Sequence, residues 1–179
     1  MNGREYESVD TLLRVSKKID ILSDWTGRIF SFLLIPLTLL VVYEVITRQL
    51  GAPTIWTFET CIFFYGAHFM LTASYGLLHK SHVCIDLIST KFSKRKDAIV
   101  SIICYILMYF PFVIIVTYYG YDFAASAWEQ LETSWSAWGP PIYPIKTVIP
   151  LTGLMLLLQG ISEVIKYMRV LTETKEVRS

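Results

Sequence analysis

The sequence predicts an all-α membrane protein with four transmembrane helices, an amphipathic interfacial helix at its N-terminus, and both termini in the cytoplasm. The composition is apolar, with 54% hydrophobic residues, only 17% charged residues and a mean hydropathy of +0.48. The uncharged residues gather in four runs of 19 to 24 residues. At about 1.5 Å per residue, each run is long enough to cross a hydrocarbon core of about 30 Å. Lys and Arg gather in the segments that four crossings place on one side.

We expect one membrane domain, residues 1–179. Its predicted order is a cytoplasmic or interfacial helix 1–28, a first transmembrane helix 29–47, a second 60–78, a cytoplasmic amphipathic connection 79–97, a third transmembrane helix 98–121, a periplasmic connection 122–146, a fourth transmembrane helix 147–165, and a cytoplasmic tail 166–179. The helix 1–28, the connection 79–97 and the tail carry fourteen of the sixteen Lys and Arg residues. Basic residues are enriched in cytoplasmic segments, so these three segments are expected inside.

The N-terminal segment has helical periodicity. Val9, Leu12, Leu13, Ser16 and Ile19 fall near one face, and most of the charged residues fall elsewhere. This pattern is typical of a helix lying on the inner leaflet, although a merely solvated leader would also fit. The first transmembrane run follows it and contains a proline that membrane helices tolerate.

The second run carries a polar seam. Its members follow spacings of four, three, four, three and four residues: Cys61, Tyr65, His68, Thr72, Tyr75 and His79. Polar groups in a membrane helix usually turn toward other protein, so we expect this seam, with His68 at its middle, to contact a partner. The positions expected to face lipid include Ile62, Phe63, Phe69, Met70 and Leu77.

The connection 122–146 carries tryptophans and acidic residues. Trp128, Trp135 and Trp138 suit the aromatic belt of a membrane interface. The segment is predicted to form a short amphipathic helix, whose acidic groups either contact a partner outside or are simply solvated.

The stretch HKSHVCID, residues 79–86, raises the question of a metal site. His79, His82 and Asp86 share one helical face, but a closed zinc site needs four ligands and the chain has no second cluster of such residues. Haem bound by two histidines would need them on facing helices, whereas His68 is alone at mid-membrane. We therefore expect no metal, no cofactor and no enzymatic activity.

Taken together, four short segments resemble the small permease subunit of tripartite ATP-independent periplasmic (TRAP) transporters, the DctQ-like family. They are Arg48 at the end of the first run, IWTFE opening the second, HVCID closing it, and YPIKTVIPLTG leading into the fourth. The resemblance extends over nearly the whole chain, including the four-span layout.

The resemblance implies functions for particular residues. Arg48, Trp56 and Glu59 match family positions around the first hairpin, while Phe58 stands where an acid is common. We expect Glu59 to neutralise Arg48, with Glu44 as its competitor and an unpaired, snorkelling Arg48 as the alternative. His82 and Asp86 match a His and an Asp after the second span and are expected to form a hydrogen-bonding corner.

The resemblance also implies a function for the whole chain. The small subunit would be a stator for a large multi-span permease that holds the sodium and substrate sites, and a periplasmic binding protein would deliver an organic acid. Expected partners are those two proteins and membrane lipids, with no nucleic acid, in a bacterial inner membrane. The alternative is a membrane anchor of a respiratory redox enzyme.

Overall fold

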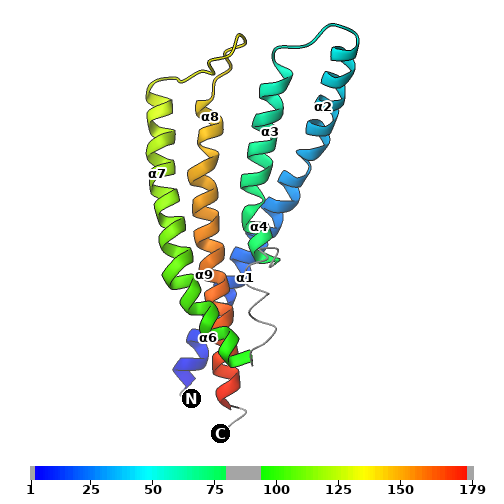
Figure 1. The fold of residues 1–179 in the computed structure, drawn as a ribbon. Coiled ribbons are helices and arrows are strands. Elements are labelled where there is room, and N and C mark those ends of the chain that lie inside the picture. The colour runs from blue at the N-terminus through cyan, green and yellow to red at the C-terminus, as the bar shows by residue number, and fades with distance from the viewer. Residues whose placement is uncertain (1–2, 80–93, 177–179) are drawn as a thin grey trace.

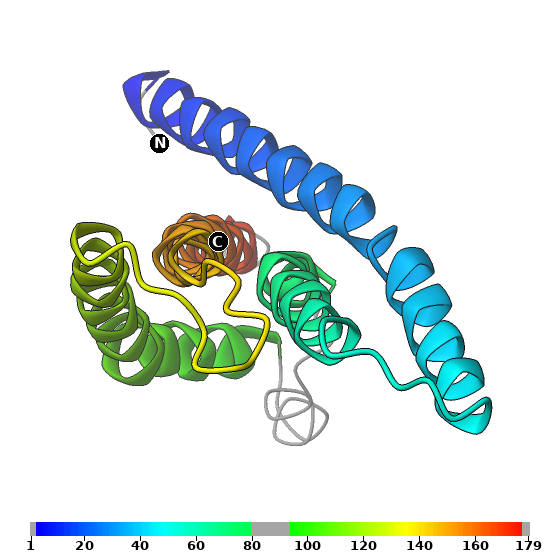
Figure 2. The same cartoon turned by 90° about the horizontal axis from the view of Figure 1, so that it is seen from above.

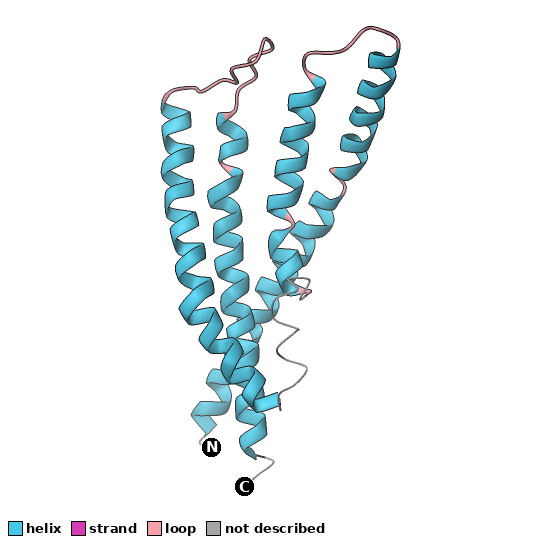
Figure 3. Cartoon of the chain, in the orientation of Figure 1, coloured by secondary structure: helices cyan, strands magenta, loops and turns pink. Residues whose placement is uncertain are grey.

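The computed structural model describes residues 3–79 and 94–176, and within them every regular element is a helix (Figures 1 and 3). In chain order these are α1 Gly3–Ser31, α2 Leu34–Gln49, α3 Thr57–Leu71, α4 Ala73–Leu78, α6 Lys94–Cys104, the π-helix η1 Tyr105–Tyr109, α7 Phe110–Glu129, α8 Tyr143–Lys146 and α9 Val148–Glu176. Both termini lie at one end of the molecule, and the α2–α3 and α7–α8 connections lie at the other (Figure 1).

Four helical segments are long and apolar enough to span a membrane, as the sequence predicts. They are Thr11–Gln49, Thr57–Leu78, Arg95–Glu129 and Tyr143–Thr172. Each contains the corresponding predicted run and extends beyond it, because the helices continue into residues too polar to be counted in the hydrophobic runs.

The first segment is broken between α1 and α2, just before Pro36. Proline lacks a backbone N–H, and its ring crowds the carbonyl four residues earlier, here that of Phe32. At the break the backbone forms hydrogen bonds between residues three apart, from Phe32 N to the Ile29 carbonyl (3.2 Å) and from Leu33 N to the Phe30 carbonyl (3.1 Å). Figure 2 shows α1 and α2 as one interrupted arm along one side of the other helices.

Helix α1, expected to lie on the inner leaflet, packs against the other helices through a face of small residues. Ser16, Ser23 and Gly27 are buried, whereas Leu12 and Leu22 are about half exposed at 46% and 49%. The periodicity correctly predicts a helix, but its small and polar residues pack inward and its large apolar residues point outward.

The third segment contains a π-helical turn, η1, immediately before Pro111. Such turns arise where a proline or an inserted group disturbs the regular hydrogen-bond ladder. The turn places the Tyr109 hydroxyl 2.9 Å from the Leu156 carbonyl oxygen on α9, to which it donates a hydrogen bond. A Cβ atom at Gly160 would lie 2.5 Å from the Tyr109 ring, so the glycine is what permits this approach.

Helix α9 is the centre of the molecule. It packs against α7, α1, α6, α4 and α3, and in Figure 2 it lies among the other helices, while α2 lies at the periphery and packs against α3. In its most apolar stretch 33% of the residues are buried, against 6% in the first segment. The other helices are therefore gathered around α9 with little burial, and most side chains along each span stay exposed on the outside of the chain.

Candidate functional site

Arg48 pairs with Glu44, and the predicted pair with Glu59 is wrong. The Arg48 Nε atom lies 2.6 Å from Glu44 Oε1, one helical turn away on α2. The second Glu44 oxygen accepts a hydrogen bond from the Thr54 hydroxyl in the connection to α3. Glu44 is the partner because residues four apart on a helix already face each other, whereas a pair with Glu59 across the hairpin must be positioned by a loop.

Glu59 instead binds the distant connection between α7 and α8. One carboxylate oxygen accepts a hydrogen bond from the Ser134 hydroxyl, and the other accepts one from the Ser136 hydroxyl at 2.9 Å. Glu59 thereby fastens the 130–142 loop to the first turn of α3. No local sequence pattern reveals a contact between positions 75 residues apart.

Trp56 and His68 lie at opposite ends of α3. Trp56 precedes the helix, with its ring 6.0 Å from that of Tyr43 on α2. His68 Nδ1 is 3.0 Å from the Phe30 carbonyl oxygen, to which it donates a hydrogen bond at the break between α1 and α2. His68 thus adds a second hydrogen bond to the Phe30 carbonyl, which also accepts one from Leu33 N. The partner-contact role of both residues stays a prediction.

The predicted polar seam of the second span is only partly enclosed. Thr72 and Tyr75 are half-buried, but Tyr65 is 59% exposed. Leu77, expected to face lipid, is 5% exposed, because α4 is packed between α1 and α9 and turns no free face outward there. Thr72, whose hydroxyl donates to the His68 carbonyl at 2.7 Å, marks the interruption between α3 and α4.

His82 and Asp86, the predicted hydrogen-bonding corner, lie outside the described residues. The described member of that group, His79, has its Nε2 atom 3.6 Å from Asp24 Oδ1 on α1. Among residues 3–79 and 94–176, no three His, Cys, Asp or Glu side chains are arranged to hold a metal ion.

The connection between α7 and α8 is not the predicted amphipathic helix. Helix α7 continues to Glu129, and the chain then forms a hairpin-like loop closed by an isolated bridge between Thr133 and Pro141. At its base, Glu132 pairs with Lys146, whose Nζ atom also lies 3.9 Å from the centre of the Phe123 ring.

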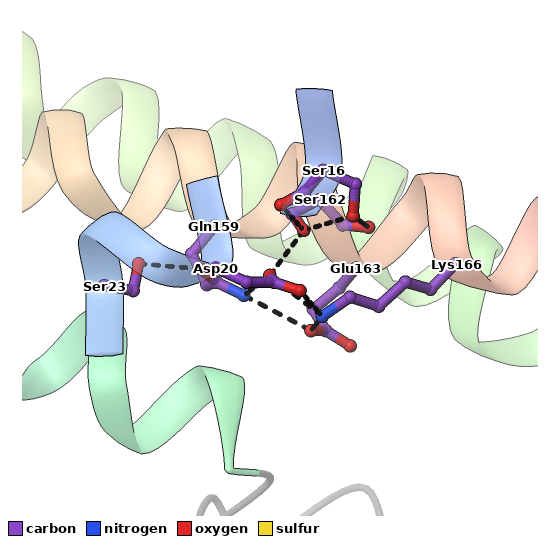
Figure 4. Close-up of polar contacts among 7 residues, drawn as sticks. All are labelled: Ser16, Asp20, Ser23, Gln159, Ser162, Glu163 and Lys166. Atoms are coloured by element: carbon purple, nitrogen blue, oxygen red, sulfur yellow. Dashed lines mark hydrogen bonds and ion pairs between the residues drawn. The ribbon is translucent and has the colours of Figure 1, made fainter. Parts of the chain in front are cut away.

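The sequence reasoning missed a buried polar network between α1 and α9 (Figure 4). It consists of Ser16, Asp20 and Ser23 on α1 and Gln159, Ser162, Glu163 and Lys166 on α9. We call it the α1–α9 network. The signal was present, because each set repeats at three- and four-residue spacing along one helical face. The prediction that α1 lies on the membrane surface obscured the match.

The network contains one positive and two negative side chains, and the cation is shared between the two acids. Lys166 Nζ lies 2.9 Å from Asp20 and 2.6 Å from Glu163, which is 3% exposed. Asp20 also accepts hydrogen bonds from Ser162 (2.7 Å) and Gln159 (3.0 Å). A buried charge is tolerable only when it is paired and hydrogen-bonded, and these groups satisfy one another.

The remaining bonds of the network join helix to helix. The Ser23 hydroxyl donates to Gln159 Oε1 at 2.7 Å, and the hydroxyls of Ser16 and Ser162 are 2.7 Å apart. Gln159 and Ser162 have no exposed surface. The arrangement fastens α1 to α9.

A comparison with protein families finds the DctQ component of tripartite ATP-independent periplasmic transporters, matching residues 37–170. No curated protein sequence is similar enough to this chain to count as a match. The match includes α9 but not α1, so half of the α1–α9 network lies outside the matched region. It gives no support to the redox-anchor alternative. Since the match extends over most of the sequence, and the chain has the four apolar helices expected of a membrane subunit, this protein belongs to the DctQ family, the small permease component of TRAP transporters.

Proposed function

We propose that this chain is the stator of a sodium-coupled TRAP transporter in a bacterial inner membrane. It would hold a large permease in the bilayer while that permease binds sodium and moves an organic acid delivered by a periplasmic binding protein. Both termini and the N-terminal part of α1 would lie on the cytoplasmic side, with the 130–142 loop in the periplasm. Substrate and sodium recognition would belong to the two partners.

The observation that carries this proposal is how little of each span is buried within the chain. Only a third or less of each span's most apolar stretch is buried, so the helices offer outward surface on nearly every side. The charged side chains buried between helices are closed on one another in the α1–α9 network. This arrangement supplies contact area for lipid and for a larger protein.

A polar group in the middle of the second span supports the proposal that this surface contacts another protein as well as lipid. The Tyr65 side chain lies about 12 Å along the helix from Thr57, and its hydroxyl has no hydrogen-bond partner among the described residues. Hydrocarbon offers no acceptor for such a group. Beside it, Gly66 has no atom within 4 Å of the position a Cβ would occupy. A helix of the large permease would supply a hydrogen-bond acceptor for the Tyr65 hydroxyl and would pack closely against Gly66.

Reconstitution tests the proposal directly. Liposomes containing this chain alone should accumulate no organic anion. Liposomes containing it with the large permease should accumulate the anion when sodium is imposed outside and the binding protein is added. A tagged copy of this chain should also retain the permease through purification. Uptake by this chain alone, or permease activity unchanged by its omission, would contradict a stator.

A further inference from the structure

The 130–142 loop is held in a defined shape at the end of the molecule opposite both termini (Figure 1). Ser134 N donates to the Pro140 carbonyl at 2.8 Å, and Ile142 N donates to the Glu132 carbonyl at 3.0 Å. These bonds close the base of the loop. The backbone N–H groups of Trp138 and Gly139 both donate to the Ser136 hydroxyl at 3.2 Å, which closes its tip.

Two contacts also tie this loop to the helices beneath it. Glu59 at the start of α3 accepts hydrogen bonds from Ser134 and Ser136. At the other side, Glu132 pairs with Lys146 at the end of α8. A loop without such contacts would have many conformations available, and these bonds hold this loop in one of them.

That conformation points a tryptophan away from the protein. Trp135 stands between the two serines that bind Glu59, and its side chain is 100% exposed. The other tryptophans of the loop region are covered to a greater degree, Trp128 at 49% and Trp138 at 43% exposure. Exposed tryptophans on rigid supports are typical of the anchor residues that dominate protein interfaces.

The charge around the loop indicates the chemistry of the partner. Glu44 is offset by Arg48 and Glu132 by Lys146, but Glu59, Asp122 and Glu129 have no cationic partner among the described residues. Glu129 and Asp122 are exposed. The described residues at this end therefore have an excess of negative charge, which favours a basic partner and disfavours an anionic membrane surface.

We propose that Trp135 is the anchor of a docking site for a water-soluble protein that presents an apolar pocket rimmed by Lys and Arg. In the complete transporter this protein is the periplasmic binding protein, so the inference rests on the proposed function. Glu59 is a positioning residue for the site, because it holds the loop through Ser134 and Ser136 while the Trp135 side chain itself is fully exposed.

The test uses the complete chain with its large permease in lipid nanodiscs and the purified binding protein as the probe. Trp135→Ala should raise the Kd of the binding protein at least tenfold. Trp25→Ala, which removes a tryptophan of 64% exposure from α1, is the matched control and should leave the Kd unchanged. Glu129→Lys should raise the Kd and weaken its dependence on salt, since charge steering is lost.

Photocrosslinking distinguishes the possible occupants. A benzophenone side chain at position 135 should form an adduct with the binding protein, and an adduct with lipid instead would overturn the inference. An unchanged Kd in Trp135→Ala, while the three proteins still transport together, would overturn the docking site and leave the stator intact. Failure of this chain to retain the permease at all would overturn both.

Discussion

At the scale of single residues, the choice of hydrogen-bond partner depends on distance in the folded chain. Arg48 had two acidic residues within reach along the sequence, and it pairs with the one on its own helix. Glu59 is thereby left for Ser134 and Ser136, which no local pattern connects to it. The two acids thus have separate tasks, since Glu44 binds Arg48 on its own helix and Glu59 holds the 130–142 loop.

A charge exchange should identify the true partner of Arg48. Arg48→Glu alone places two acids beside each other and should lower the Tm in detergent by a few degrees. Adding Glu44→Arg should recover much of the loss, because the pair is restored in reversed order. Adding Glu59→Arg should not. Recovery with Glu59→Arg instead would mean that the pair across the hairpin forms after all.

Gln159 should be the most sensitive single position of the α1–α9 network. Its side chain is fully buried and bonds Ser23, Asp20 and Glu163. Gln159→Leu leaves those groups short of partners and should lower the free energy of unfolding by about 2 kcal/mol. Denaturant titration in detergent measures it.

The control for Gln159 is Leu154→Met, an exposed position on the same helix, which should change the unfolding free energy little. Equal effects of the two substitutions would show that the network contributes nothing specific.

At the scale of elements, small residues decide how closely the helices approach. A Cβ atom at Gly153 on α9 would lie 2.2 Å from Thr117 Oγ1 and 3.1 Å from the Thr117 Cα on α7. The α7–α9 contact is the most extensive in the fold. Without a hydrophobic driving force between helices, such close backbone packing supplies much of the attraction.

Gly153→Ala should therefore push α7 away from α9 and lower the free energy of unfolding by about 1–3 kcal/mol. Gly66→Ala offers a matched control, because it adds the same methyl group on α3 where no atom lies within 4 Å. That control should be neutral or slightly stabilising in the isolated chain, since alanine favours helix. A neutral Gly153→Ala would mean that the two helices are less closely packed than described.

At the scale of the whole molecule, the structure makes α1 part of the fold although the family match begins at residue 37. The residues of α9 that face α1 are polar and buried, so α9 cannot simply turn them to lipid. We therefore expect the family-matched region to fold poorly without α1 in this chain.

Removing residues 1–32 should sharply reduce accumulation of the protein in the membrane, because Gln159 and Ser162 lose their partners on α1. Replacing Gln159 by Leu and Ser162 by Ala in the truncated chain should restore part of the accumulation, since these two buried polar side chains are then not left unpaired and Glu163 keeps Lys166. Quantitative immunoblotting of membranes gives the readout. Full accumulation of the unmodified truncated chain would show that α1 is dispensable.

The sequence by itself determined the number and position of the spans and the family resemblance. Both depend on properties that residues carry locally, namely the free energy of transfer of each side chain and the order of short motifs. The break before Pro36 is local for the same reason, because proline removes a hydrogen bond wherever it stands.

Only the tertiary structure decided which polar groups meet. Ser16 and Ser162 are 146 positions apart, and Glu59 and Ser134 are 75 apart. The inward face of α1 and the burial of Leu77 likewise depend on the neighbouring helices that pack against each position. In a membrane both faces of a helix can be apolar, so hydrophobicity alone does not indicate the inward face, and the pairing of polar groups supplies that information.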